Sequence, residues 1–300
     1  MKNWIRFSVI FSLILVLFVP SISASAHSIT KTDETMTMSA SIGNIRNGPS
    51  TDHEVILKYR RGTQFHVIGY TTNSKGEKWY QIKFSSGQIG WASSTILKEN
   101  DGVLLDVPLI SQQPELARGC EVTSLAMMLQ YAGVNVDKMT LAEQVKKDPT
   151  PYSEKDGNVY FGNPNTGFVG NMYTFSEEGY GVYHGPIAQL AEQYLPNRVV
   201  DFTGSSFETI YQYLDEGKPV WVINNTWFDI VPSEYWQTWQ TPAGPIEVTM
   251  KEHSVLVTGY DDEYIYFNDP LANMKNRKIS KEKFKRGWEQ MGSQAITYKK

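Results

Sequence analysis

The stretch GCEVTSLAMML, residues 119–129, holds the single cysteine of the 300-residue chain. Its apolar side chains recur at steps of three and four residues, the spacing of one buried helical face. Cys120 is therefore predicted to begin a buried helix. The free N–H groups and partial positive charge at a helix N-terminus stabilise a thiolate, so the pattern predicts a lowered thiol pKa and a reactive cysteine. The competing interpretation is a small buried apolar residue, the commoner role of an isolated cysteine.

The N-terminus has the three parts of a secretory signal peptide. Lys2 and Arg6 make a positive start, residues 7–18 are apolar, and Ala24-Ser25-Ala26 is a small-residue cleavage site. The apolar run is shorter than the roughly 20 residues of a membrane span. We therefore expect removal of residues 1–26, a secreted, extracellular or cell-wall-associated protein, and no integral membrane segment after cleavage. An exported chain with one cysteine forms no internal disulfide, which favours a free reactive thiol or an intermolecular bond.

Charge is distributed unevenly along the chain. The whole sequence has a formal net charge of −4, and residues 99–300 contain 17 Lys or Arg against 27 Asp or Glu. Residues 27–98 instead contain nine Lys or Arg against five Asp or Glu. The acidic bulk argues against a nucleic-acid partner. The basic front portion favours an anionic surface such as a cell wall, although an ordinary solvated face accounts for it equally well.

Residues 34–98 contain short strand patterns separated by glycine turns, which predicts a small barrel. Four motifs resemble the bacterial SH3-like domain: NIRNGPS (44–50), KWYQIKF (78–84), SGQIGW (86–91) and TILK (95–98). The resemblance implies a module that binds cell-wall peptidoglycan or a peptide. A purely structural barrel is the alternative. The polar residues 99–102 are predicted to form the linker.

Residues 103–300 place helices before an antiparallel sheet, an α+β order. We predict helices at residues 120–132, with Gly133 as cap, and at 140–147, 187–194, 207–215 and 280–290. Capping boxes are predicted at Thr140–Glu143 and Ser205–Glu208. Predicted strands cover residues 103–110, 219–224, 247–249, 253–260 and 264–267. Residues 148–186 form a long loop-rich segment, and the aromatic residues 227–239 are interpreted as a substrate groove, a lid or a packed cover.

His253 and Asp269 are the candidate partners of Cys120. A cysteine nucleophile needs a base, and the base needs a third group that orients it. His253 begins an apolar strand 133 residues after Cys120, and Asp269 ends the partner strand of the same hairpin. Paired strands are close enough for Asp269 to accept the second imidazole N–H. Gln112 is preferred over Gln113 as the side chain that would donate to an oxyanion. Each residue alone also fits a structural role, but their order and geometry together favour a triad.

Six segments resemble the secreted bacterial relatives of the double-glycine leader peptidases, which are papain-fold cysteine peptidases. They are LLDVPLISQ (104–112), GCEVTSLAMMLQYAG (119–133), GFVGNMY (167–173), GYGVYHGPI (179–187), GKPVWV (217–222) and HSVLVTGYDDEYIYFNDP (253–270). The resemblance implies Cys120 as nucleophile, His253 as general base, Asp269 as orienting residue and Gln112 as oxyanion donor, without a cofactor. Glu121 departs from the glycine that follows the nucleophile in transporter-linked members. Its carboxylate either raises the thiol pKa or stabilises the helix N-terminus.

We therefore expect an α+β protein, with a papain-like cysteine peptidase fold (103–300) preceded by a small all-β SH3-like barrel (34–98). The expected function is a secreted thiol hydrolase that cleaves a peptide or amide bond in a peptide, a protein, or peptidoglycan or another cell-wall polymer. The alternative is a non-catalytic cell-wall-binding protein that keeps the papain-like fold. A zinc site made of His184, His253 and Asp269 is less favoured, because zinc prefers closely spaced ligands.

Overall fold

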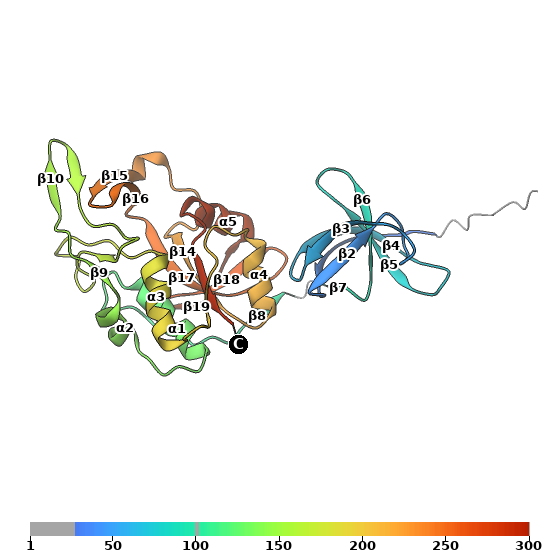
Figure 1. Cartoon of the computed structure of the whole chain (residues 1–300), viewed down its shortest axis with the longest axis horizontal. Coiled ribbons are helices and arrows are strands. Elements are labelled where there is room, and N and C mark those ends of the chain that lie inside the picture. Colours follow the sequence, from blue (N-terminus) through green and yellow to red (C-terminus); the bar gives the residue numbers. More distant parts are fainter. Residues whose placement is uncertain (1–27, 100–101, 300) are drawn as a thin grey trace, which may run out of the picture.

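The computed structural model describes residues 28–99 and 102–299 (Figure 1). An N-terminal all-β region precedes a mixed α and β region, which confirms the predicted fold class. The predicted signal peptide, residues 1–26, lies outside the described residues. Within those two ranges, no helix combines the length and the apolar character that a membrane crossing needs.

The N-terminal region is one antiparallel sheet of seven strands in the order β3-β2-β6-β5-β4-β1-β7. The strands are β1 (Thr30–Met38), β2 (Ile42–Arg46), β3 (Val55–Arg60), β4 (Gln64–Thr72), β5 (Lys78–Lys83), β6 (Ile89–Ser93) and β7 (Leu97–Glu99). Side chains alternate between the two faces of a strand. In β4, Phe65 and Val67 are buried while His66 is exposed. The inward side chains form a core that belongs to this region alone.

The C-terminal region is built on a mainly antiparallel central sheet in the order β13-β20-β14-β17-β18-β19, with β8 also paired to β17. The strands are β8 (Val103–Leu104), β13 (Val199–Asp201), β14 (Val220–Asn225), β17 (Glu252–Tyr260), β18 (Tyr264–Asp269), β19 (Met274–Ser280) and β20 (Ala295–Tyr298). Only the first two residues of the strand predicted at 103–110 form ladder pairs. The predicted hairpin of β17 and β18 is confirmed, with its turn at Asp261 and Asp262.

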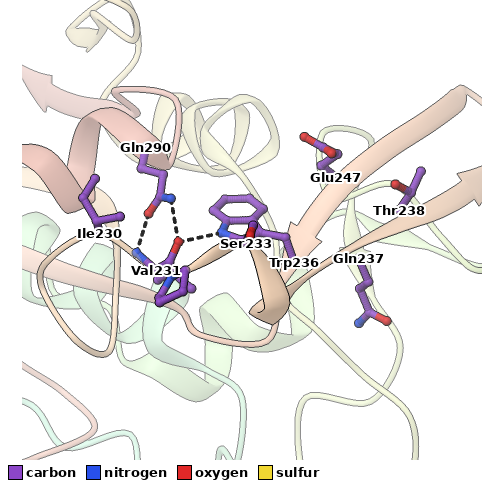
Figure 2. A pocket seen from close by; sticks show the side chains of 9 residues that line it. Ile230, Val231, Ser233, Trp236, Gln237, Thr238, Glu247 and Gln290 are labelled. Carbon is purple, nitrogen blue, oxygen red and sulfur yellow. Dashed lines mark hydrogen bonds between the residues drawn. The ribbon is translucent and has the colours of Figure 1, made fainter.

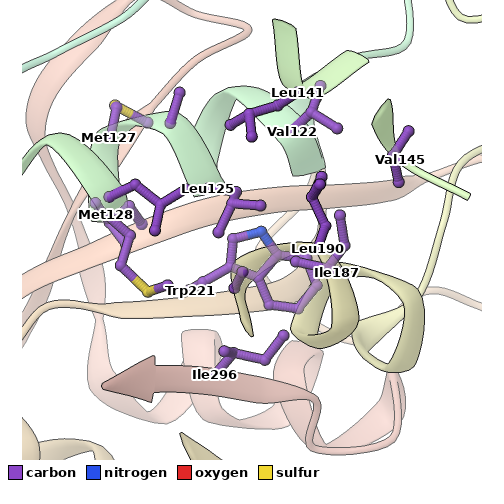
Figure 3. Packing of buried hydrophobic residues seen from close by; sticks show 14 of the residues in the cluster. Val122, Leu125, Met127, Met128, Leu141, Val145, Ile187, Leu190, Trp221 and Ile296 are labelled. Carbon is purple, nitrogen blue, oxygen red and sulfur yellow. The ribbon is translucent and has the colours of Figure 1, made fainter. Parts of the chain in front are cut away.

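Helices pack on both faces of this sheet. They are α1 (Cys120–Tyr131), α2 (Lys138–Gln144), α3 (His184–Tyr194), α4 (Glu208–Asp215) and α5 (Lys281–Gln290). Along β14, Trp221 and Ile223 join the core shared with α1 and α3, whereas Val220 and Val222 join the core shared with α4 and α5. Helix α1 is buried from residue 120 to residue 129 and packs against β14 and β17 (Figure 3). A helix buried on all sides holds its N-terminus in a fixed position.

The segments predicted to be loop-rich or irregular contribute short strands. A four-stranded sheet has the order β10-β11-β15-β16, and β9 pairs with β12. Their bounds are β9 (Lys147–Asp148), β10 (Ser153–Lys155), β11 (Asn158–Tyr160), β12 (Phe168–Val169), β15 (Trp236–Thr241) and β16 (Gly244–Thr249), with a 3-10 helix η1 at Ser233–Tyr235. The parallel pairing of β11 with β15 joins the two segments. Strands β9 to β12 have two or three residues, which is too short to show an alternating pattern, so the sequence did not predict them. The six-residue β15 was also not predicted, whereas the strand predicted at 247–249 is the last part of β16.

Both predicted capping boxes are wrong. Helix α2 begins after Asp137, whose side chain accepts the backbone N–H of Met139 at 2.8 Å and of Thr140 at 3.0 Å. Helix α4 begins after Phe207 and has no side-chain cap, so the box at Ser205–Glu208 does not form. A short polar motif predicts a helix start only to within a turn, because tertiary packing decides which donor is satisfied.

Candidate active site

Cys120 is the first residue of α1 and lies beside the start of β17. Ser124 Oγ donates to the carbonyl of Ser254 in β17 at 3.2 Å. The indole of Trp221 in β14 donates to the carbonyl of Glu121 at 2.9 Å. These bonds tie the first turn of α1 to two central strands. The thiol, in a residue 7% exposed, is therefore positioned by the core rather than by a loop.

His253 and Asp269 form a buried pair at one end of the central hairpin. His253 Nε2 lies 2.9 Å from Asp269 Oδ1. Asp269 Oδ1 also accepts the backbone N–H groups of Leu271 and Ala272 at 3.0 Å, and Oδ2 accepts Arg277 Nη1 at 2.7 Å. Because Nε2 is bonded to the carboxylate, Nδ1 is the ring nitrogen left to face another group.

The surroundings of Asp269 keep it ionised. Burial opposes the charge, but the hydrogen bond and charge of His253, with further bonds from Ala272 and Arg277, hold the pKa of Asp269 below its usual range. An ionised carboxylate accepts the Nε2 proton and so orients the ring.

Cys120, His253 and Gln112 line one cavity of about 200 Å³. Its other lining residues are Ala117, Arg118, Phe175, Tyr180, Thr226, Met250, Glu252 and Leu271. Asp269 does not line the cavity, but it is hydrogen-bonded to His253. The structure therefore brings together all four residues that the sequence singled out.

The side-chain amide of Gln112 donates hydrogen bonds to backbone carbonyls. The residue is 2% exposed, and Nε2 donates to the carbonyls of Leu116 at 3.2 Å and Ala117 at 3.1 Å. Its backbone N–H donates to the carbonyl of Pro270 at 3.0 Å, which ties it to the residue after Asp269. Gln112 Oε1 is buried and has no hydrogen-bond partner in the described part of the chain. Donation to an oxyanion therefore requires one N–H to turn away from a carbonyl.

The thiol of Cys120 lies against a carboxylate. Cys120 Sγ donates to Glu121 Oε2 at 3.3 Å. Burial first, and then the negative charge of Glu121, raise the pKa of the thiol well above its ordinary value, and Glu252 adds to this effect only where it is ionised. The predicted lowering of this pKa by the helix N-terminus is wrong, because burial and the carboxylate of Glu121 outweigh the partial charge of the helix. Both effects predicted for Glu121 have support, since its charge raises the pKa of the thiol and its carboxylate lies in the first turn of α1.

The zinc ligands considered from the sequence do not gather in one place. His184 Nδ1 lies 2.5 Å from Asp201 Oδ2 and lines a different cavity from His253. Among the described residues, the group with donor atoms close enough for a cation is Cys120, Glu121 and Glu252, whose donor atoms lie within 4.8 Å of one another.

The aromatic segment at residues 227–239 combines a cavity wall with a packed cover. A cavity of about 550 Å³ runs along it and includes neither the cysteine nor the site histidine (Figure 2). There the Trp236 indole donates to the Val231 carbonyl at 3.2 Å, and Gln290 bonds both the N–H and the carbonyl of Val231 at 2.8 Å. Trp239, in contrast, is 2% exposed within an aromatic cluster.

Three neighbours of the site were not predicted from the sequence. The ring of Phe228 packs edge-on against His253 at 6.0 Å between centroids, and the guanidinium of Arg277 lies 4.8 Å from the Phe228 centroid. Arg277 lies in β19, whose sequence shows no apolar alternation that would have marked it as a strand. Glu252 directly precedes His253 in the sequence, and this adjacency was the one feature that could have predicted its place near the site.

Comparisons with known proteins agree with this architecture. The model of the family described as Peptidase_C39 like matches residues 104–296, and that of the bacterial SH3 domain matches residues 41–98. The chain is 52% identical over 198 residues to the uncharacterized protein YvpB of Bacillus subtilis (strain 168), a match that covers 65% of this chain and 76% of that protein.

A solved structure supports the same assignment. The crystal structure of a Bacillus anthracis protein described as a candidate C39-like peptidase is 53% identical, with a TM-score of 0.62, and the match covers 67% of this chain and 98% of that one. A shorter match, 36% over 55 residues, is to serine/threonine-protein kinase D of Synechocystis and covers 18% of this chain and 11% of the kinase. The chain therefore belongs to the Peptidase C39-like family and carries an N-terminal bacterial SH3 domain.

Proposed function

We propose that the protein is a secreted cysteine peptidase with Cys120 as nucleophile, His253 as general base and Asp269 as the residue that orients the base. One observation carries the proposal: Cys120 and His253 line the same cavity while Asp269 holds His253 Nε2 at 2.9 Å. Family membership adds the expectation of a peptide substrate.

In the proposed reaction, Cys120 Sγ attacks the carbonyl carbon of the scissile bond while its proton passes to His253 Nδ1. Asp269 stabilises the imidazolium that forms. When the tetrahedral intermediate collapses, the C–N bond breaks and His253 returns the proton to the leaving amine. Water activated by His253 then hydrolyses the thioester and releases Cys120 as the thiol.

Two donors are proposed for the oxyanion. The first N–H groups of a helix have no intrahelical partner, so the backbone N–H of Cys120 is one of them. The second is Gln112 Nε2, after one N–H turns from the Ala117 carbonyl toward the substrate oxygen. Hydrogen bonds of this kind often align only in the substrate complex.

The substrate is proposed to be a peptide or protein, with a peptide bond of cell-wall peptidoglycan as the specific candidate. The match of residues 41–98 to the bacterial SH3 domain and the excess of basic residues over residues 27–98 support targeting to an anionic wall. The signal-peptide pattern of residues 1–26 supports the proposed secretion. Fractionation of an expressing culture tests it: a chain in the medium or wall fraction beginning at His27 is expected, whereas an intact Met1 in the cell interior contradicts it.

Digestion of two substrates tests the catalytic assignment. The chain from His27 onward is incubated with denatured protein and with purified cell wall, and the products are identified by mass. Wild type is expected to release peptides from at least one substrate, and Cys120→Ala and His253→Ala to release none. His66→Ala is the matched control, since His66 is an exposed histidine of the SH3 domain. Product release by Cys120→Ala would exclude the cysteine mechanism.

The protonated state of the thiol favours the second candidate, a wall-binding protein without catalysis. Burial and Glu121 hold the proton on Cys120 in the free protein. This candidate predicts that wild type sediments with purified walls but releases no products from either substrate. If wild type releases products and the Cys120→Ala variant does not, this candidate is excluded.

A further inference from the structure

Two acidic side chains lie together beside the candidate nucleophile, Glu121 buried and Glu252 half-buried. Glu121 is 0% exposed, and its carboxylate, that of Glu252 and Cys120 Sγ lie within 4.8 Å of one another. Glu121 Oε2 accepts the S–H of Cys120 at 3.3 Å, and Oε1 accepts the backbone N–H of Val182 at 2.7 Å. Glu252 Oε1 is also buried and lacks a hydrogen-bond partner among residues 28–99 and 102–299.

The segment before α3 closes over this carboxyl pair. A Cβ atom placed on Gly181 would lie 2.4 Å from Glu121 Oε1 and 3.0 Å from Glu252 Oε2. Neither distance leaves room for a side chain. The backbone at Gly181 therefore packs directly on both carboxyl groups.

Few charged or titratable groups surround the pair. Those nearby are Cys120 on α1, His253 on β17, Tyr180 and Tyr183 on the segment before α3, and Arg118 just before α1. The two tyrosine hydroxyls bond each other at 2.9 Å, and His253 is bonded to Asp269. Arg118 donates to the carbonyls of Asn171 and Thr174. Within the described ranges, no ion pair joins a Lys, Arg or His to Glu121 or Glu252.

Two buried carboxyl groups without a cation do not both ionise near neutral pH. Glu121 lies in the first turn of α1 and accepts two hydrogen bonds, so its environment favours the negative charge. Glu252 lacks such donors and keeps the proton. Consistent with this division, burial raises the pKa of Glu121 to about 7, and burial together with the charge of Glu121 raises the pKa of Glu252 well above its usual value.

We propose that Glu121 controls the protonation state of Cys120: as a carboxylate it keeps the proton on the thiol, and once protonated itself it permits transfer of the thiol proton to His253. Burial brings the titration of Glu121 close to neutral pH, and Glu252, which keeps its proton, is a neutral neighbour in that site. The proposal rests on the proposed function only in taking Cys120 as the nucleophile. It predicts a peptidase that is most active on the acidic side of the Glu121 titration.

Alkylation of the single cysteine tests the proposal without any substrate. Iodoacetamide labelling of wild type, Glu121→Gln and Glu252→Gln is followed by intact mass from about pH 5 to about pH 10. Glu121→Gln removes a buried negative charge next to the thiol, so labelling at neutral pH should accelerate at least about tenfold and its pH midpoint should fall by about one unit or more. Glu252→Gln should shift the midpoint less, because Glu252 already carries a proton. Glu143→Gln, in an exposed part of α2, is the control and should match wild type.

An unchanged midpoint in Glu121→Gln, or slower labelling of that variant at every pH, overturns the proposal. Carbon-13 NMR of the glutamate carboxyl groups in wild type provides a second measurement that needs no variant. One carboxyl signal should titrate near pH 7 and move when Cys120 is alkylated, and titration of every glutamate near its ordinary value would also refute the proposal. Cysteine alkylation and carboxyl NMR need no substrate, so both can be measured even if the protein has no peptidase activity. The proposal about Glu121 and the proposed function can therefore be refuted independently.

Discussion

Asp269 accepts hydrogen bonds from three parts of the chain: the imidazole of His253, the backbone after β18 and the guanidinium of Arg277. His184 and Asp201 make a contact of the same kind, but their side chains are each 29% exposed, whereas those of His253 and Asp269 are 3% and 1% exposed. Water screens the exposed pair and leaves the buried one strongly coupled. Burial, rather than the contact itself, makes Asp269 a plausible orienter of a catalytic base.

Asp269→Asn should lower peptidase turnover by about 10²- to 10⁴-fold, the range in which a positioned acid–base group contributes. The amide no longer accepts the Nε2 proton as a charged partner, so it does not stabilise the imidazolium. Steady-state kinetics on the substrate found for wild type measure the loss. Asp201→Asn is the matched control and should leave turnover unchanged. Equal losses in the two variants would point to misfolding rather than catalysis.

Helix α1 shows how an element positions the candidate nucleophile. Its buried side chains pack on β14 and β17 (Figure 3). Hydrogen bonds from Ser124 and to the carbonyl of Glu121 join its N-terminal part to both strands. The thiol can therefore move little relative to β17, where His253 lies. The geometry of the site depends on the packing of this helix, even though most of the helix is far from the chemistry.

Leu125→Ala should reduce the free energy of unfolding by about 2–5 kcal/mol, because it leaves a cavity under α1 at a fully buried position. Urea unfolding followed by circular dichroism measures the change. Ile42→Ala removes a side chain that is 65% exposed and should change stability by at most about 0.5 kcal/mol. A Leu125→Ala protein as stable as wild type would contradict the central role of this helix in the core.

Asp148, at the end of β9, ties together the long segment before α3. Its oxygens accept the N–H of Thr150 at 3.0 Å and of Asn163 at 2.9 Å, and also the hydroxyl of Thr166. Burial opposes its charge, but these hydrogen bonds lower the pKa of Asp148 to about 2. Its stabilising effect is therefore complete above the usual aspartate pKa and is lost as the pH falls through about 2.

Asp148→Asn should consequently destabilise the protein at neutral pH and make less difference as the pH approaches the folded-state pKa. Urea midpoints of wild type and variant, measured from about pH 6 down to about pH 2.5, test this convergence. A gap between the two midpoints that stays constant across that range would show that the ionised carboxylate is not what stabilises the segment.

The whole molecule has separate cores for its two regions. The buried cluster of the SH3 domain contains residues of that domain alone, and the remaining clusters belong to the peptidase domain. Between the regions, Lys98 Nζ lies 3.5 Å from Asp215 Oδ1 with the lysine side chain 47% exposed, Tyr260 shares a side-chain hydrogen bond with Thr37, and Gly62 packs against Gln212. A pair with one exposed partner contributes about 0–1 kcal/mol. Each region should therefore fold without the other.

Removal of the SH3 domain should leave turnover of soluble protein within about twofold of the full chain, since independently packed domains retain their own stability. Retention on purified cell walls should be lost. Both are measured on a chain beginning at Gly102, with the full chain from His27 as reference. Loss of turnover of the soluble substrate would show that the peptidase domain depends on the SH3 domain. Undiminished retention of the shortened chain on walls would show that the peptidase domain itself binds them.

Local patterns in the sequence were enough to predict the features that depend on neighbouring residues. The spacing of apolar residues after Cys120 predicted α1, and alternation on both sides of Asp261 predicted the hairpin that brings His253 to Asp269. The residue types of a cysteine site were recognisable because each role requires particular chemistry.

Tertiary structure alone decided the electrostatics and the detailed bonding of the site. The pKa of Cys120 rises instead of falling because folding buries the thiol against the carboxylate of Glu121, and the same packing brings in Glu252, which is 131 residues after Glu121 in the sequence. The amide of Gln112 is bonded to the backbone, and Arg277 reaches Asp269 from a strand that lacks apolar alternation. Desolvation and long-range contacts exist only once the chain is packed, so neighbouring residues in the sequence could single out the candidate nucleophile but not the state of its proton.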